Sequence, residues 1–360
     1  MAGRSDGPGL RRRPRPGRTD LTGEGMRRAG IFNDTSISGH YGCTAVMGTI
    51  LRELAARDVA PAYLWPVAED WKPHAASLDR VRPDLIVVNG EGTIHHSAER
   101  KRTRDLIDLA AHARKLQVPA HLINASIEAL DLPALEGLRQ FTTIHVRETG
   151  SLRYLAQHGI AARCVPDLSL GQPAPAAVAR SGILVTDSVL GEAARRLREF
   201  AAAVGAGHER MKPRIGRWEK LRRDMGRLVR RSPALREWRP ISDPCAFIRR
   251  VAGAELVVTG RFHSVLLAIL TDTPFVALAS NTGKTEAVLM DVFGHTDRLI
   301  REEDLTDPAF LRRLDGGLSF TEAERAALAR YREGAARARA TLFDGIVGRT
   351  DAAVLRGAQA

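Results

Sequence analysis

The chain has 360 residues, 44% hydrophobic and 27% charged, a composition typical of globular proteins and a length sufficient for two domains. It has no apolar run near the ~18 residues of a membrane span, and its three cysteines have neither disulfide-scaffold nor metal-site spacing. The net charge of +12 first suggests nucleic acid. However, residues 209–239 alone hold twelve Lys or Arg against four Asp or Glu, and no nucleic-acid-binding motif is visible. We therefore expect no nucleic-acid partner.

Residues 1–25 are rich in Arg, Gly and Pro and lack apolar periodicity, which predicts a disordered basic leader. Met26 opens the stretch MRRAGIFN, which reads as the entry to a first strand. We expect 1–25 to be either an upstream over-extension or a dispensable tail. No apolar segment follows the N-terminal arginines, so no secretory signal is predicted. With the low cysteine content, this indicates a cytoplasmic protein.

Strand and helix patterns alternate from Met26 onward, which indicates parallel sheets with crossover helices. The expected strands cover residues 29–33, 84–89, 119–124, 143–147, 162–166, 182–186, 254–259 and 273–278. The expected helices cover residues 43–57, 105–116, 151–158 and 322–342. We predict an α/β protein with two doubly wound, Rossmann-like domains facing a cleft.

A Pro-containing break, GQPAPAA from Gly171, marks the expected domain boundary. The predicted N-terminal domain spans residues 26–171 and supplies the acceptor side and part of the cleft. The predicted C-terminal domain spans 172–345 and supplies the donor side, and 346–360 form a tail.

The stretch TGRFHSVLLA, residues 259–268, is the most informative in the chain. A strand ends at Gly260, and Arg261 and His263 stand where an apolar helix begins. Ligands of open α/β sheets bind beyond the carboxyl ends of strands, and a helix N-terminus offers free N–H groups to an anion. Arg adds a fixed charge and His a titratable proton. This corner suits a small phosphorylated substrate; the alternative is a structural Arg–His pair.

The next strand exit carries another cation. The strand TPFVAL is followed by the polar loop SNTGK, which ends at Lys284. The order TGRFHS, TPFVAL, Lys284 resembles the polysaccharide pyruvyl transferases, whose fold is similar to that of the two-domain GT-B glycosyltransferases. The resemblance covers most of residues 29–300.

The first two strand exits of the N-terminal domain resemble the same family with departures. Where members have an Asn-x-Gly-Asp type of loop, this chain has Asn33-Asp34 and a displaced Gly39-His40. Where members show Gly-Gly-Gly-Thr, Glu91 replaces the middle glycine before Gly92. The structural alternative for the first loop is a polar turn with a helix cap. The adjacent His95 and His96 lack an acidic partner at ligand spacing, so we expect no metal site there.

Two further positions match the family closely. Arg147 lies in an Arg-Glu-x-x-Ser element and matches the anion-binding arginine, although a surface pair with Glu148 is the alternative. Asp167 follows the strand that carries Cys164, and we expect it to shape the inter-domain cleft.

The resemblance implies transfer of pyruvate from phosphoenolpyruvate to a saccharide, free or lipid-linked, as a cyclic ketal in exopolysaccharide or cell-surface glycan biosynthesis. No metal or other cofactor is expected. His263 is the candidate general acid, and Asp34, His40 or Glu91 can accept the hydroxyl proton. The expected substrate-binding residues are Arg147, Arg261, Lys284, Asn33, Gly92, Glu91 and Asp167.

Two alternatives remain open for the function. One is a GT-B-type glycosyltransferase that uses a nucleotide sugar, with Glu286 holding the ribose. The other is a non-catalytic saccharide-binding paralogue.

The basic segment 209–239 is also open to two interpretations, because its apolar residues recur at helical spacing. Such a basic amphipathic helix either packs on the core or attaches the protein to the inner face of the membrane. The apolar residues are Ile215, Trp218, Leu221, Met225 and Leu228.

Overall fold

A computed structural model of the protein describes residues 26–176, 178–213, 241–279, 283–315 and 317–348. The predicted leader 1–25 lies outside these residues, as does most of the predicted basic helix 209–239. Within the described part of the chain, no helix is both long and apolar enough to cross a membrane.

The first half of the chain forms a six-stranded parallel sheet in the order β2-β1-β3-β4-β5-β6. Its strands are β1 (Arg27–Asp34), β2 (Val59–Pro66), β3 (Leu85–Glu91), β4 (Ala120–Ala125), β5 (Thr143–Val146) and β6 (Arg163–Cys164). Its helices are α1 (Tyr41–Ala55), α2 (Ala75–Val81), α3 (Lys101–Leu116), α4 (Leu132–Leu138) and α5 (Thr149–Gln157). Every residue of β3 is buried, as expected for a strand with helices on both faces. Strand β2 was not predicted because it contains two prolines, which a strand at the sheet edge tolerates.

The second half forms a five-stranded parallel sheet in the order β11-β10-β9-β7-β8. Its strands are β7 (Ile183–Ser188), β8 (Gly207–Glu209), β9 (Leu256–Gly260), β10 (Phe275–Leu278) and β11 (Leu299–Ile300). Its helices are α6 (Gly191–Ala203), α8 (Pro244–Ala252), α9 (Phe262–Leu270), α10 (Lys284–Phe293), α11 (Pro308–Asp315) and α12 (Glu322–Ile346). The predicted α/β class with two doubly wound sheets is confirmed. In this sheet the strand order reverses between β7 and β9.

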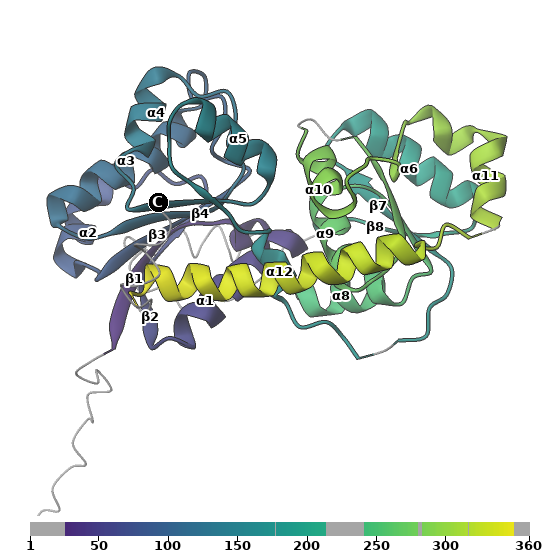
Figure 1. The fold of residues 1–360 in the computed structure, drawn as a ribbon, viewed down its shortest axis with the longest axis horizontal. Coiled ribbons are helices and arrows are strands. Elements are labelled where there is room, and N and C mark those ends of the chain that lie inside the picture. Colours follow the sequence, from purple (N-terminus) through teal and green to yellow (C-terminus); the bar gives the residue numbers. More distant parts are fainter. Residues whose placement is uncertain (1–25, 177, 214–240, 280–282, 316, 349–360) are drawn as a thin grey trace, which may run out of the picture.

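Helix α12 runs along both halves of the molecule (Figure 1). Thr321 and Glu324 form a reciprocal capping box that starts it. Leu328 belongs to the core of the second half, whereas Leu342 and Phe343 pack with the strands and helices of the first. One continuous helix therefore fixes the two sheets relative to each other.

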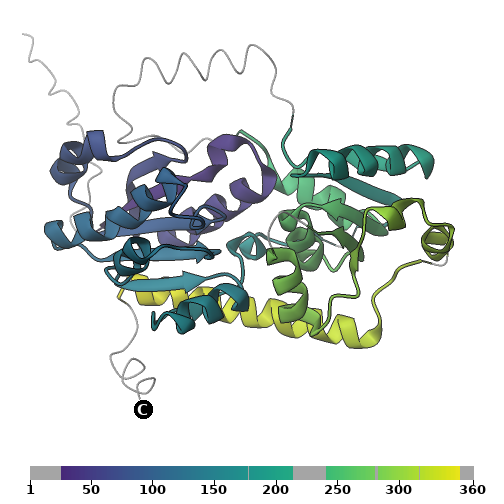
Figure 2. The same ribbon diagram turned by 90° about the horizontal axis from the view of Figure 1, so that it is seen from above.

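Helix α1 lies at the boundary between the two halves (Figure 2). The Tyr41 N–H donates to the carbonyl of Met211 at 3.0 Å, and the hydroxyls of Thr44 and Ser242 are 2.8 Å apart. On the other side of the boundary, the Thr149 N–H donates to the Asp291 carboxylate at 3.0 Å. The strand ends of both sheets are thus held close together.

Candidate active site

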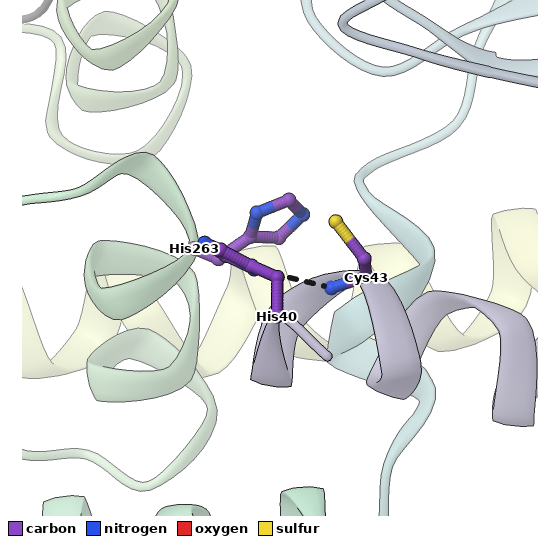
Figure 3. Close-up of side chains that lie close together, drawn as sticks. All are labelled: His40, Cys43 and His263. Carbon is purple, nitrogen blue, oxygen red and sulfur yellow. Dashed lines mark hydrogen bonds between the residues drawn. The ribbon is translucent and has the colours of Figure 1, made fainter. Parts of the chain in front are cut away.

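The first turn of α1 is packed against the first turn of α9. His40 is the N-cap of α1, and its Nδ1 accepts the Cys43 N–H at 3.5 Å. The imidazoles of His40 and His263 lie with centroids 5.3 Å apart at 60°. Figure 3 shows His40 and Cys43 approaching His263 from the α1 side. Burial, His263 and Arg261 lower the pKa of His40 well below its usual value, so its ring is neutral near pH 7.

His263 is buried, and its Nε2 has no hydrogen-bond partner among the described residues. The nearest carboxylate is that of Asp167, whose Oδ2 lies 3.9 Å from Nε2. Burial lowers the pKa of His263, while Asp167 and Glu91 act in the opposite direction. An anion arriving beside this ring would raise that pKa and favour the protonated form.

Arg147 follows β5 and is 1% exposed. Its Nη1 donates to Asp167 Oδ2 at 2.9 Å and its Nε to the Ser126 hydroxyl at 2.7 Å. The guanidinium lies 4.6 Å from the centre of the Phe262 ring, within the range of a cation–π interaction. The alternative of a surface pair with Glu148 does not describe Arg147, because both side chains are buried and Asp167 is the closer carboxylate, at 2.9 Å against 3.7 Å for Glu148.

Lys284, the first residue of α10, approaches Arg147 from the other half of the molecule. Its Nζ lies 5.7 Å from the centre of the Phe262 ring. Burial, followed by repulsion from Arg147, lowers the pKa of Lys284 to about 8. A β-carbon at Gly92 would lie 3.7 Å from Arg147 Nη2 and 4.0 Å from Lys284 Nζ. The two cations therefore converge where Gly92 leaves space.

Glu91, at the end of β3, is also part of this cluster and has a positive φ of 39°. Its Oε1 accepts the Thr35 hydroxyl at 2.5 Å and the Asn89 amide at 3.1 Å. Its Oε2 accepts the Cys43 thiol at 3.2 Å. Burial and this carboxylate raise the pKa of the Cys43 thiol well above its usual value, so the thiol keeps its proton.

Asn33 and Asp34 lie at the neighbouring end of β1, where both make structural contacts. The Asn33 amide donates to the Asn89 carbonyl at 2.6 Å, which ties the ends of β1 and β3 together. Asp34 caps a short 3-10 helix, Thr35–Ser38, by accepting the Ser36 N–H at 3.0 Å.

The structure places Arg261 differently from the other predicted cations. Its Nε and Nη2 donate to the two carboxylate oxygens of Asp187 at 2.9 and 2.7 Å. The sequence led us to expect that Arg261, His263 and Lys284 would cluster. The structure brings His263 and Lys284 together with Arg147 around Phe262, and turns Arg261 toward Asp187.

Two groups in the described structure have donor atoms close enough for a metal ion. The first is His40, Cys43 and His263, whose ligand atoms lie within 4.8 Å of one another. The second is His95, His96 and Glu128, although Arg100 also contacts His95 there. These residue types suit zinc. In the first group, however, His40 Nδ1 already caps α1 and the thiol already donates to Glu91.

Sequence reasoning missed three residues of this region. Asp187 follows the predicted strand 182–186, so the strand-exit position that singled out Arg147 would also have found it. Cys43 and Phe262 lie close to residues that the sequence did suggest: Cys43 follows His40 by three positions, and Phe262 stands between Arg261 and His263. Their roles become visible only through tertiary contacts, Cys43 with Glu91 and Phe262 with Arg147.

A model of one protein family covers most of this region. The family described as polysaccharide pyruvyl transferase matches residues 40–282. The chain belongs to the polysaccharide pyruvyl transferase family. Membership supports a transferase and implies a saccharide acceptor. The matched range includes His40, Glu91, Arg147, Asp167 and His263 and ends just before Lys284. No curated protein matches the chain in sequence.

Several solved structures with a similar architecture are UDP-N-acetylglucosamine 2-epimerases. The UDP-GlcNAc 2-epimerase of Methanocaldococcus jannaschii, in complex with UDP-GlcNAc and UDP, is 13% identical with a TM-score of 0.53, covering 88% of this chain and 99% of its own. A putative UDP-N-acetylglucosamine 2-epimerase from Listeria monocytogenes is 12% identical with a TM-score of 0.54, covering 91% and 97%. The Neisseria meningitidis UDP-GlcNAc 2-epimerase is 10% identical with a TM-score of 0.53, covering 90% and 100%. At these identities the likeness shows the GT-B-like fold.

Proposed function

We propose that this member of the family transfers pyruvate from phosphoenolpyruvate to two hydroxyls of a saccharide, forming a cyclic ketal and releasing inorganic phosphate. One observation carries the proposal: Arg147 and Lys284 converge above Gly92, next to the buried and unpartnered Nε2 of His263. A cationic niche beside a proton donor fits a small donor that carries two anionic groups and must be protonated on carbon.

The donor's phosphate and carboxylate would occupy the niche between Arg147 and Lys284. Arg147 is fixed by Asp167 and Ser126, so it presents its remaining nitrogen Nη2 without reorganisation. Lys284 has a pKa lowered by burial and by this arginine. A bound anion would offset the repulsion between Lys284 and Arg147. The free site therefore favours an anionic ligand.

We assign proton donation to His263. Once the anionic donor is bound, its charge and Asp167 raise the pKa of the imidazole, which then carries a second proton. The imidazolium gives that proton to the methylene carbon of phosphoenolpyruvate, and the central carbon becomes electrophilic. The first saccharide oxygen bonds to that carbon. The second oxygen then displaces the phosphate as the bond between the central carbon and the phosphate oxygen breaks, and the ketal closes. The neutral imidazole of His263 takes up the proton of this second hydroxyl, and the proton of the first hydroxyl leaves with the phosphate.

Glu91 is the best-placed acceptor for the proton of the first hydroxyl. Its Oε2 faces the Cys43 thiol and acts electrostatically on His263 and Lys284, so it lies within the cluster. Asp34 caps a 3-10 helix and His40 Nδ1 caps α1, so these two side chains already serve the backbone. We propose that His40 orders the α1 end of the site and that Glu91 accepts the proton.

The experiment that tests this function combines the purified protein with phosphoenolpyruvate and a panel of nitrophenyl and lipid-linked saccharides. The expected result is inorganic phosphate released in equal amount with a product heavier by one pyruvyl ketal in mass spectrometry. Phosphate release without a ketal would indicate a hydrolase and contradict the proposal. We also expect a cytoplasmic protein, with peripheral membrane contact through 209–239 as a further prediction.

A further inference from the structure

A second cavity lies at the end of the second sheet, separate from the niche above Gly92. Its volume is about 680 Å³, within the range of about 300–1,000 Å³ typical of small-molecule sites. It opens beyond β7 and β9, where the strand order reverses, the position at which doubly wound sheets bind ligands. Its walls include Tyr41, Asp187, Ser188, Arg198, Arg210 and Arg261.

The charges around this cavity leave a positive excess. The carboxylate of Asp187 is neutralised by the two-point pair with Arg261. The other carboxylate in the wall, Glu209, is paired with Arg250. Arg198 and Arg210 are exposed, and neither forms an ion pair with any carboxylate of the described chain. Among the described residues, both arginines are therefore open to an anion.

The start of helix α6 lies beside the same cavity. This helix of thirteen residues has no side-chain hydrogen bond at its N-cap, Leu190. Ala194, in its first turn, lines the cavity. The Ala194 N–H itself donates to the Leu190 carbonyl, so the contribution of this helix start is its dipole, which favours an anion such as a phosphate near the N-terminus. The arginines and the helix start thus point to the same ligand chemistry.

Two residues that line the cavity lie next to the proposed reaction site. Tyr41 lines the cavity and directly follows His40 in the chain. Arg261 lines it as well and is the N-cap of α9, two residues before His263. Arg261 also contributes to lowering the pKa of His40. A ligand anchored in the cavity can therefore extend its other end toward His40 and His263.

We propose that this cavity binds the phosphate or diphosphate of the acceptor, so that the saccharide is presented as a glycosyl phosphate or diphosphate. This inference rests on the pyruvyl transfer proposed above, in which the donor occupies the separate niche of Arg147 and Lys284. Anchoring by phosphate would leave the sugar hydroxyls at the histidines. A nucleoside diphosphate sugar and a lipid diphosphate sugar share this chemistry, and the probes below distinguish them.

Calorimetry on the full chain with inorganic pyrophosphate, UDP and geranyl diphosphate tests the cavity without turnover. Arg198→Ala should weaken pyrophosphate binding about 10- to 100-fold, the usual effect of losing a hydrogen bond to a charged group. Arg195→Ala is the matched control, since this arginine lies on the same helix but pairs with Glu192 and Glu199. Its affinity should equal that of the wild type. Tighter binding of UDP would identify a nucleotide-linked acceptor, and tighter binding of geranyl diphosphate a lipid-linked one.

The same titrations separate this inference from the proposed function. Pyrophosphate should bind equally well with and without saturating phosphoenolpyruvate, because the two anions occupy different sites. Competition between them, absence of pyrophosphate binding, or equal affinity in Arg198→Ala and wild type would overturn the acceptor cavity. Pyrophosphate binding that depends on Arg198 in a protein that does not bind phosphoenolpyruvate would contradict the proposed donor instead, and leave the cavity as an anion site.

Discussion

Gly42 in α1 lies directly against the imidazole of His263 in α9. A β-carbon at Gly42 would be 2.2 Å from Cγ and 2.3 Å from Cβ of the histidine, distances that no real contact allows. The absence of a side chain at this one position lets the two halves of the molecule meet where the proposed proton donor stands. His263 is thus positioned by the half of the chain that does not contain it.

Gly42→Ala should displace His263 and abolish most of the phosphate release from phosphoenolpyruvate. In an ordinary helix this change would stabilise the protein by about 0.5–1 kcal/mol. At position 42 the clash with His263 should instead destabilise the protein and lower its melting temperature. Gly334→Ala is the matched control, because Gly334 lies within α12 and an added methyl group there would meet no atom within 4 Å. Equal activity in both variants would show that His263 does not need its observed position.

His263→Asn should lower the rate about 100- to 10,000-fold, the usual effect of losing a general acid, with donor affinity changed only a few-fold. The Asn side chain keeps a polar group in the pocket, so the fold should survive. Phosphate release and phosphoenolpyruvate affinity, measured on the same preparation, check this. A rate near that of the wild type would remove His263 from the proton transfer.

Lys284→Met should stabilise the protein while it weakens phosphoenolpyruvate binding at least tenfold. The pKa of Lys284 lies at about 8 instead of 10.5, so holding the buried ammonium beside Arg147 costs on the order of 1–3 kcal/mol near neutral pH. Denaturant unfolding and calorimetry measure the two effects. A less stable Lys284→Met protein would mean that the ammonium has a favourable partner in the free site.

The same lysine predicts a pH dependence. Its pKa is lowered in the folded state, so the unfolded chain binds more protons between about pH 8 and 10.5. Stability contributed by this group should therefore rise with pH over that window, and the rise should be missing in Lys284→Met. Phosphoenolpyruvate affinity should change in the opposite direction, falling as pH increases above about 8. A wild type and a variant with parallel stability profiles would contradict the assignment.

Arg147→Lys should damage donor binding more than Arg261→Lys does. A lysine at 147 keeps the charge but cannot contact Asp167, Ser126 and a ligand at once, whereas Arg261 pairs with Asp187 away from the niche. We expect at least a tenfold loss of phosphoenolpyruvate affinity for the first variant and a smaller loss for the second. Calorimetry at constant pH compares them. A larger loss of phosphoenolpyruvate affinity in Arg261→Lys than in Arg147→Lys would indicate that Arg261 belongs to the donor site.

Local sequence was sufficient to predict much of the fold and several residues of the candidate site. Apolar runs followed by polar or glycine residues were sufficient to predict β3, β5 and β9. Glu91, Arg147 and His263 lie at or just beyond the carboxyl ends of these three strands. The carboxylate partner of Arg261 could not be predicted, because Asp187 meets it only through the pairing of β7 with β9. The contact between Cys43 and Glu91 likewise depends on how α1 packs over β3. The packing of α12 on both halves depends on tertiary contacts that its Ala- and Arg-rich sequence does not reveal.

Titration of phosphoenolpyruvate into the wild type and Lys284→Met at pH 7 probes the proposed donor site without any knowledge of the acceptor. We expect saturable binding at one site in the wild type, weakened at least tenfold in the variant and unaffected by pyrophosphate. Absence of saturable binding in the wild type, or equal affinity in both proteins, would contradict the claim that Arg147 and Lys284 form the donor site.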